Sequence, residues 1–345
     1  MNSKTLHTSS KYTYMFMCIK MKDFAKETSK YGGLMKGAFF LLVLWPLLAS
    51  CEILAPTNAT FEGEKYAVVV GINDYIDNTN NLIRDLDFCA ADAEAMKDML
   101  TGAGWQVELI TAEANESIKK NATKEKIKTA FQKDKDGLTA FLFYFSGHGD
   151  VHEDQAYIVP SDAYRSCKSV EKSSMISATE LSMWLKDLNA NKIMIFDSCY
   201  SGGFVNPGDC IDAAPGNIES DQISTNIEMF FRFGEILAQN SASAARSPST
   251  APLVISASGS NEASMEDANE RPTHGSGHGF FTYYFLQSGE ASKDGSMKGD
   301  LDGDGILSCL EAYNYAKKAL EKDWTASQLP HITGGLRDFA LIDLR

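Results

Sequence analysis

The stretch Asp197-Ser198-Cys199-Tyr200-Ser201-Gly202-Gly203 decides the fold that this sequence predicts. It follows residues 191–196 (NKIMIF), an apolar run short enough to be a buried parallel strand. A second such run, residues 140–145 (AFLFYF), is followed by Ser146-Gly147-His148-Gly149. Open α/β sheets bind their ligands at the carboxyl ends of the strands. We therefore expect two buried strands to bring a histidine and a cysteine to one edge of the same sheet.

Composition sets the limits of the interpretation. The 345 residues, 44% of them hydrophobic, suffice for one large α/β domain or two small ones. A net charge of −14 argues against a nucleic-acid partner. The seven cysteines form no Cys-x-x-Cys pair, so a structural zinc site is not expected, and they are too sparse for a disulfide-dense scaffold.

The first 51 residues have the composition of a targeting segment. Residues 37–50 (GAFFLLVLWPLLAS) form an apolar run of signal-peptide length, shorter than the roughly 20 residues of a membrane span. Leu48-Ala49-Ser50-Cys51 resembles the lipobox of bacterial lipoproteins, in which the cysteine is lipidated and becomes the mature N-terminus. We expect residues 1–51 to direct export and to leave Cys51 as a lipid anchor on a bacterial cell membrane, facing the periplasm or the surface. The alternative is a buried core helix.

The remaining chain reads as a short tether, residues 52–64, and a domain, residues 65–345. Strands and helices alternate, which predicts an α/β fold with a mostly parallel sheet and helices on both faces. Residues 206–252 differ in composition and include a low-complexity part at 241–252, so we expect a flexible segment between the two halves. The expected strands are 65–72, 105–110, 140–145, 156–160, 191–196, 253–258 and 339–344; the expected helices are 86–100, 122–132, one beginning at 177, 280–286 and 310–322.

Cys199 and His148 are candidates for a nucleophile and its base. Neighbouring strands lie about 4.8 Å apart, so side chains at their carboxyl ends can share a hydrogen bond. An imidazole that takes the thiol proton produces the thiolate, and the imidazolium then lowers the thiol pKa. The amides of Gly149 and Cys199 are the best donors for an oxyanion. The alternative is an inert buried cysteine and a structural histidine.

The two motifs, SGHG at 146–149 and DSCYSGG at 197–203, resemble those of caspase-like cysteine peptidases, on the bacterial, metacaspase-like side. A histidine about 50 residues before the cysteine is a known pattern of that family. The resemblance spans roughly residues 65–344. It implies a caspase-like three-layer sandwich and a cysteine endopeptidase with a Cys–His dyad that acts on proteins or peptides.

The same resemblance predicts the substrate side chain. Metacaspases cut after Arg or Lys and carry an aspartate two residues before the cysteine, which is Asp197 here. They line the pocket from a Cys-x-x-Asp, matched by Cys89 and Asp92, and from the serine at Ser146. Carboxylates in such a pocket pair with a guanidinium or ammonium group. Alternatively, Asp92 is an exposed acid in the first turn of a helix, and Asp85 or Asp87 serves the pocket instead.

Autoprocessing between the two halves is a further implication of the resemblance. Arg246 stands alone in the part of the chain with the most flexible composition, whereas Arg232 lies in an aromatic stretch. We expect any self-cleavage to occur after Arg246.

Residues 300–311 (DLDGDGILSCLE) fit an EF-hand calcium loop position by position. The preceding residues 289–299 do not look helical, so half an EF-hand is the most that the sequence offers. We expect Ca²⁺ in a structural or activating role and no organic cofactor; the alternative is a solvated acidic turn before a helix. The expected ligands are Asp300, Asp302, Asp304, the carbonyl of Ile306, Ser308 and Glu311.

Two other interpretations stay open. Legumain-like and gingipain-like enzymes share the His-Gly and Cys motifs, but Asp197 favours the metacaspase side. A protein of another class, a non-catalytic calcium-binding surface lipoprotein, would use the same fold to bind a partner. The presence of His148, Gly149 and Cys199 together argues against that second interpretation.

Overall fold

The computed structural model describes residues 63–75, 83, 85–113, 122–132, 137–152, 155–166, 169–199, 252–258, 277–323, 328, 330–333 and 338–345. All of them belong to the compact unit Pro56–Arg345. Cys51, Arg246 and nearly all of the tether and of segment 206–252 lie outside the described residues. Among the described residues, no helix is both long enough and apolar enough to cross a membrane.

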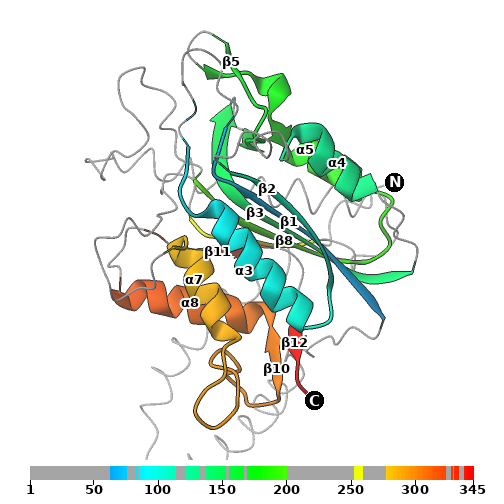
Figure 1. Ribbon diagram of the computed structural model, residues 1–345. Coiled ribbons are helices and arrows are strands. Elements are labelled where there is room, and N and C mark those ends of the chain that lie inside the picture. The colour runs from blue at the N-terminus through cyan, green and yellow to red at the C-terminus, as the bar shows by residue number, and fades with distance from the viewer. Residues whose placement is uncertain are drawn as a thin grey trace, which may run out of the picture. The chain divides into compact units, whose positions relative to one another are not determined.

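A mostly parallel sheet forms the centre of this unit (Figure 1). Its strand order is β11-β9-β8-β3-β1-β2, with β11 antiparallel to β9 and the other neighbours parallel. Strand β4 (Gln155–Ile158) forms an antiparallel hairpin with the end of β3, and β7 (Ile176–Ser177) pairs antiparallel with β4. The six strands of the main order are β1 (Glu64–Ile72), β2 (Gln106–Ala112), β3 (Leu138–His152), β8 (Asn191–Cys199), β9 (Leu253–Ser256) and β11 (His331–Thr333).

The central strands are apolar on both faces. In β3, Phe141, Phe143 and Phe145 belong to one hydrophobic core. The alternating residues Ala140, Leu142 and Tyr144 belong to the other core. Successive side chains of a strand point to opposite faces, so continuous apolar runs are what a sheet covered on both sides requires.

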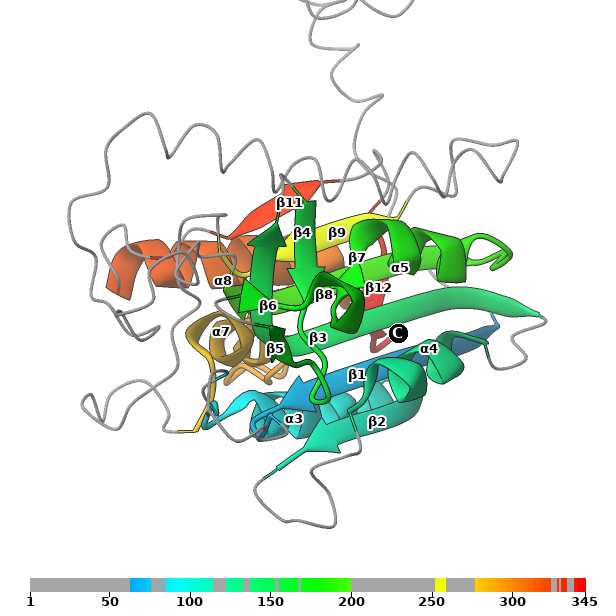
Figure 2. The same ribbon diagram turned by 90° about the horizontal axis from the view of Figure 1, so that it is seen from above.

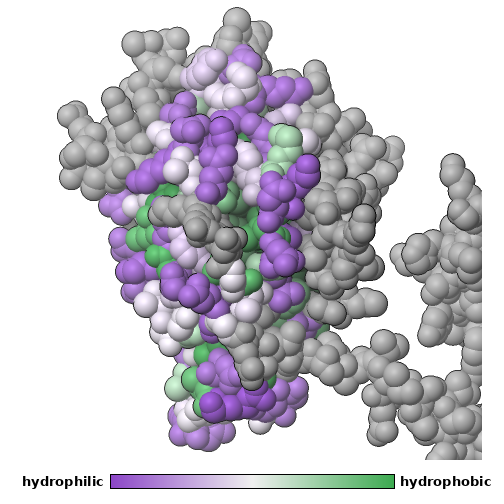
Figure 3. Space-filling view, turned by 90° about the vertical axis from the view of Figure 1, so that its right-hand side faces the viewer, coloured by the Kyte–Doolittle hydropathy of each residue, from purple (hydrophilic) through white to green (hydrophobic). Residues whose placement is uncertain are grey.

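Helices cover both faces, which gives three layers (Figures 1 and 2). On one face lie α4 (Lys124–Gln132) and α5 (Ala178–Leu185); on the other lie α3 (Cys89–Gly102), α7 (Phe280–Ser288) and α8 (Cys309–Asp323). The side to the right in Figure 1 presents mostly hydrophilic residues, with smaller hydrophobic areas between them (Figure 3). The three-layer α/β architecture expected from the sequence, a mostly parallel sheet with helices on both faces, is confirmed.

Local signals in the sequence explain where the helices begin. Thr123 Oγ1 accepts from the Lys126 amide at 3.2 Å at the start of α4. Ser177 and Glu180 form a reciprocal capping box at the start of α5. The smaller elements are β5 (Arg165–Ser166), β6 (Ser169–Val170), the 3-10 helix η3 (Lys172–Ser174), β10 (Ile306–Ser308) and β12 (Ala340–Asp343).

Two expected boundaries were wrong. Helix α3 begins at Cys89 instead of residue 86, because the Leu86 amide donates to the Asn73 carbonyl and Asn73 Oδ1 accepts from the Ala90 amide at 2.8 Å. Strand β3 does not end at residue 145 but continues through His148 and Gly149. Its last residues leave the parallel ladder and pair with β4, so the expected histidine loop is a hairpin strand. The last strand, β12, pairs with β10 in a separate small sheet.

Candidate active site

His148 and Cys199 form the last register pair between the parallel strands β3 and β8. Paired residues of neighbouring strands lie about 4.8 Å apart in the sheet. Cys199 is the final residue of β8 rather than the first residue after it. Register alone therefore brings the two predicted catalytic residues side by side at the carboxyl edge of the sheet.

His148 is held by a tyrosine that the sequence analysis did not single out. Its side chain is buried, with 2% of its surface exposed, and its ring lies 4.9 Å from the ring of Tyr75, tilted by 36°. The His148 amide donates to Tyr75 Oη at 2.7 Å. The Tyr75 amide in turn donates to Asp85 Oδ1 at 3.0 Å. Asp85, considered above as an acid of the pocket, is exposed and instead supports the residue that orients the histidine.

The Gly149 amide is the predicted oxyanion donor. Gly149 pairs with Ile158 in the β3–β4 hairpin, and the Val159 amide donates to the His148 carbonyl at 3.0 Å. Since successive residues of a strand direct their backbone groups to opposite sides, a regular ladder turns the Gly149 N–H toward β8. That is the side on which Cys199 lies.

Asp92 lies in the first turn of α3, and only 1% of it is exposed. Its Oδ2 accepts from Ser146 Oγ at 3.1 Å, and the Gly279 amide donates to Oδ1 at 3.1 Å and to Oδ2 at 3.2 Å. His278 Nδ1 lies 2.9 Å from Asp92 Oδ1. The alternative interpretation of Asp92 as an exposed helix acid is therefore wrong.

Asp197 lies at the N-terminus of α7, which begins directly after Gly279. Its Oδ2 accepts from the Thr282 amide at 3.2 Å and from Thr282 Oγ1 at 2.6 Å. A Cβ built on Gly279 would lie 2.9 Å from Asp197 Oδ2 and 3.0 Å from Asp92 Oδ2, so both carboxylates approach the same point of the chain. The N–H groups of the first turn and the dipole of α7 stabilise negative charge there.

The pKa of Asp92 is shifted from its ordinary value. Burial raises the pKa of Asp92 to about 7; the hydrogen bond from His278 opposes the rise, and the nearby Asp197 adds to it. Burial, followed by the two carboxylates, raises the pKa of the Tyr144 phenol, whose oxygen lies 2.6 Å from Thr282 Oγ1. The site therefore favours a cation, or a shared proton, beside its two acids.

Cys89, also predicted for this pocket, is the first residue of α3, one turn before Asp92. Its thiol is buried and forms no disulfide. The structure thus brings Cys89, Asp92, Ser146 and Asp197 to one region, between the start of α3 and the carboxyl edge of β3 and β8 (Figure 1).

Sequence reasoning missed four residues of the site: Tyr75, His278, Gly279 and Thr282. A signal existed for the last three, because the run GSGHG at 275–279 directly precedes an apolar helix. Glycine just before a helix marks its N-terminus, and a helix N-terminus is where carboxylates bind.

The acidic loop of residues 300–311 forms a second group. Carboxylate oxygens of Asp300, Asp302 and Asp304 lie within 4.8 Å of one another. Asp300 accepts from three backbone amides, those of Gly303, Asp304 and Gly305, at 2.8–3.2 Å. Gly305 has φ +83°, as the turn requires. A set of oxygen donors around a tight turn suits a hard cation such as Ca²⁺.

Glu311 does not join the three aspartates. Its Oε1 accepts from the Leu301 amide and its Oε2 from the Ser308 amide, both at 3.0 Å. Ser308 Oγ accepts from the Glu311 amide at 3.1 Å. These two predicted ligands thus make a capping box for α8. Ile306 begins β10 and pairs with Asp343 of β12.

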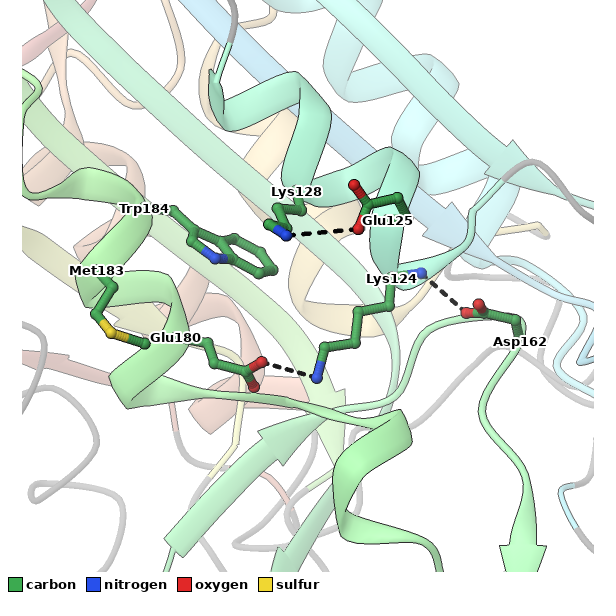
Figure 4. Close-up of a pocket in the computed structure, with 7 residues that line it drawn as sticks. All are labelled: Lys124, Glu125, Lys128, Asp162, Glu180, Met183 and Trp184. Carbon is green, nitrogen blue, oxygen red and sulfur yellow. Dashed lines mark hydrogen bonds and ion pairs between the residues drawn. The ribbon is translucent and has the colours of Figure 1, made fainter.

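A separate cavity of about 440 Å³ lies between α4 and α5 (Figure 4). Its charges are matched among themselves: Lys124 pairs with Glu180 at 2.8 Å and Lys128 with Glu125 at 3.5 Å. Asp162 accepts from the Lys124 amide at 2.8 Å. None of the predicted site residues lines this cavity, and it contains no acid–base or nucleophile arrangement of its own.

A mostly parallel sheet between two helical layers, with a histidine and a cysteine paired at its carboxyl edge, defines a caspase-type cysteine peptidase fold. The caspase domain model matches residues 64–339, and the chain therefore belongs to the caspase-domain family.

Solved structures that are similar to this chain include a protein from Geobacter sulfurreducens and caspase-1 from Spodoptera frugiperda. The former is 18% identical with a TM-score of 0.49, over 82% of this chain and 100% of that chain. The latter is 11% identical with a TM-score of 0.48, over 84% and 96%. No curated protein sequence matches this chain significantly.

Proposed function

We propose that this protein is a cysteine endopeptidase of the metacaspase-like kind, which hydrolyses peptide bonds after Arg or Lys. One observation carries the proposal: the His148–Cys199 register pair lies two residues beyond a second register pair, Ser146–Asp197. In this arrangement the same two strands supply the nucleophile, its base and the start of a cation pocket.

The proposed reaction uses a Cys199–His148 dyad. His148 takes the proton of the Cys199 thiol, and the thiolate attacks the carbonyl carbon of the scissile bond. The oxyanion accepts hydrogen bonds from the amides of Gly149 and Cys199. The His148 imidazolium then gives its proton to the leaving amine, and a thioester remains. His148 next takes a proton from water, whose attack on the thioester releases the acid and the thiol.

The proposed specificity rests on the two buried carboxylates. Asp92 and Asp197 both approach Gly279, at the N-terminus of α7. A guanidinium or ammonium group would offset their negative charge, whereas an acidic side chain would add to it in a dry site. This supports Arg or Lys, and not Asp, before the scissile bond.

Hydrolysis of a small arginyl-amide substrate, with an aspartyl-amide for comparison, tests the proposal. We expect turnover of the arginyl substrate only, and a loss of about 10³-fold or more in both Cys199→Ala and His148→Ala. Preference for the aspartyl substrate would overturn the specificity. Absence of turnover with and without calcium would favour the non-catalytic binding module.

We also propose that Ca²⁺ binds the loop of residues 300–311 in a structural role. The support is the oxygen-only donor set of Asp300, Asp302 and Asp304 and the turn at Gly305. Glu311 would have to give up its bonds to the Leu301 and Ser308 amides to become a ligand, which favours weak binding.

The lipid anchor at Cys51 remains a proposal that rests on the lipobox-like sequence. Expression in a bacterial host tests it: wild-type protein should partition with membranes, and Cys51→Ser should not. Equal partitioning of the two would contradict it.

Self-cleavage after Arg246 is likewise proposed from the sequence. Mass spectrometry of purified wild-type protein should find one fragment that ends at Arg246 and another that begins at Ser247. Neither fragment should appear in Cys199→Ala or Arg246→Gln. A nick at Arg246 in Cys199→Ala would exclude self-cleavage there.

A further inference from the structure

His278 lies between the buried pocket and the surface. About a quarter of its side chain, 26%, is exposed, whereas Asp92, to which its Nδ1 is hydrogen-bonded at 2.9 Å, is 1% exposed. It immediately precedes Gly279, whose amide binds the same carboxylate. The imidazole therefore contacts Asp92 from the solvent side, where a substrate side chain would also arrive.

The elements that carry the pocket residues provide little other positive charge. The sequences of α3, β3, β8 and α7 contain no arginine and two lysines. Lys97 pairs with Asp98 at 3.1 Å. Lys192 shares the face of Met194 and Phe196, opposite to that of Asp197. His278 is thus the basic side chain that contacts Asp92 directly.

Among the residues that the structure describes, the other titratable groups linked to the pair add negative charge or none. Asp197 of β8 also approaches Gly279. The Tyr144 hydroxyl of β3 is linked to Asp197 through the Thr282 hydroxyl. Cys89 of α3 is buried close by. A buried carboxylate beside a second one is costly when uncompensated, so a proton shared with an imidazole is the favoured state.

We propose that His278 and Asp92 hold one proton between them in the free protein, and that this proton leaves when a guanidinium or ammonium group enters the pocket. The inference rests on the proposed Arg/Lys specificity and deepens it. The entering cation takes over the charge that the proton supplied, and the proton passes to the solvent. His278 acts as a positioning residue: it fixes the Asp92 carboxylate and makes recognition of the cation dependent on pH.

Calorimetric titration of the full-length Cys199→Ala protein with agmatine, a small guanidinium compound, tests the inference. At pH 7, in phosphate, HEPES and Tris buffers, the dependence of the heat on buffer ionisation enthalpy counts the protons released. We expect a release of about half to one proton, and an affinity that falls up to about tenfold per pH unit on acidification below neutrality. Above pH 9 the release should vanish.

The matched variant is His278→Asn, which keeps a donor near the position of Nδ1 but cannot take up a proton. Because the imidazole lowers the pKa of Asp92, we expect the midpoint of the affinity–pH profile to rise by about one pH unit, with about a three- to tenfold loss of affinity at pH 7. Glu94→Gln replaces an exposed acid on α3, the helix of Asp92, and should leave the midpoint and the affinity at pH 7 unchanged. A purely structural role of His278 would alter affinity equally at all pH values.

The outcomes separate the two levels of the proposal. Binding of agmatine without proton release, at an affinity constant from pH 6 to 9, overturns the inference and leaves the proposed specificity intact. Absence of agmatine binding up to pH 9, together with absence of arginyl-amide turnover by wild type, overturns the proposed function itself. The proton count is measured with His278 present, so the test stands even if His278→Asn fails to fold.

Discussion

Two groups of aspartates in this protein use similar backbone contacts in opposite surroundings. Asp92 and Asp197 accept amides at the N-terminus of α7 and are nearly inaccessible to water. Asp300, Asp302 and Asp304 accept amides within a tight turn, and the last two are exposed. Both groups consist of aspartates that accept backbone amides, and they differ in how far the carboxylates are exposed to solvent.

Burial decides what each group can bind. A carboxylate pair in a dry site interacts strongly with any charge that enters, so it discriminates between a cation and an anion. An exposed group is screened by water and salt, and a cation must compete with hydration to bind there. The buried pair is therefore suited to selecting a substrate side chain, and the exposed group to weak binding of an ion that stabilises a loop.

The largest expected effect is on cation recognition. Asp197→Asn keeps an acceptor for the Thr282 amide but removes one buried negative charge. Loss of one partner of a buried charge pair costs several kcal/mol, so kcat/KM for the arginyl-amide should fall about 10²–10³-fold. Steady-state kinetics measure it, with Asp98→Asn, an exposed acid on α3, as the control. A loss of less than threefold would mean that Asp197 does not contact the substrate cation.

The second expected effect is on stability against pH. The folded protein raises the pKa of Asp92 from 3.8 to about 7, so the folded state binds the Asp92 proton more tightly than the unfolded state. Between about pH 4 and 7 this residue's contribution to stability therefore declines as pH rises, and above pH 7 the full penalty is present. Asp92→Asn removes the penalty.

We expect the free energy of unfolding of Asp92→Asn to match wild type near pH 4 and to exceed it by about 2–3 kcal/mol at pH 8. Urea unfolding at a series of pH values measures the difference. Asp98→Asn should give a curve parallel to that of wild type. Parallel curves for Asp92→Asn as well would show that Asp92 is ionised at no cost.

The contrast between the two groups also marks how far the sequence predicted the structure. Apolar runs and the glycines and polar residues between them predicted the order of strands and helices. Because the carboxyl ends of parallel strands lie at one edge of a sheet, residues 148 and 199 were predicted to lie close together. Burial of Asp92 was not decidable, because an acid in the first turn of a helix looks the same whether it faces water or a neighbouring helix. Its partner His278 is 186 positions away, and no local pattern carries such a contact.

Local rules that overlap caused the other differences. Ser308 and Glu311 satisfy the calcium-loop pattern and the capping-box pattern at once, and the structure uses them as a cap. Residues 146–149 contain two glycines and a histidine, which favours a loop, but pairing of residues 146–148 with β8 and of Gly149 with β4 keeps them extended. In both places a tertiary or helix-end contact decides between two readings that the sequence allows.

A smaller effect on stability is expected at Gly279, whose backbone contacts the carboxylates of Asp92 and Asp197. Gly279→Ala would place a Cβ within 3.0 Å of both carboxylates, forcing them apart or outward. We expect a loss of about 1–2 kcal/mol in stability, with weaker agmatine binding. Gly102→Ala, at the last residue of α3 with no atom within 4 Å of the new Cβ, should be neutral or stabilising by up to about 1 kcal/mol. Equal stability of the two variants would mean that the carboxylates can move freely.

The smallest effect should belong to the exposed group, because an ion that binds there gains little over water. Sites of this kind in extracellular modules bind Ca²⁺ with Kd of about 10⁻⁴–10⁻³ M, so about 5 mM Ca²⁺ should stabilise the fold by about 1–2 kcal/mol. Thermal unfolding with calcium or chelator measures the gain. The double variant Asp302→Asn/Asp304→Asn keeps oxygen acceptors for the loop amides but removes two charges, and it should lose the gain. Asp294→Asn, an exposed acid in the preceding turn, should retain it. An equal gain in the double variant, or with Mg²⁺ in place of Ca²⁺, would mean that calcium acts only by general charge screening. Among the described residues, the buried pair Asp92 and Asp197 would then be the one acidic cluster suited to bind a specific cation.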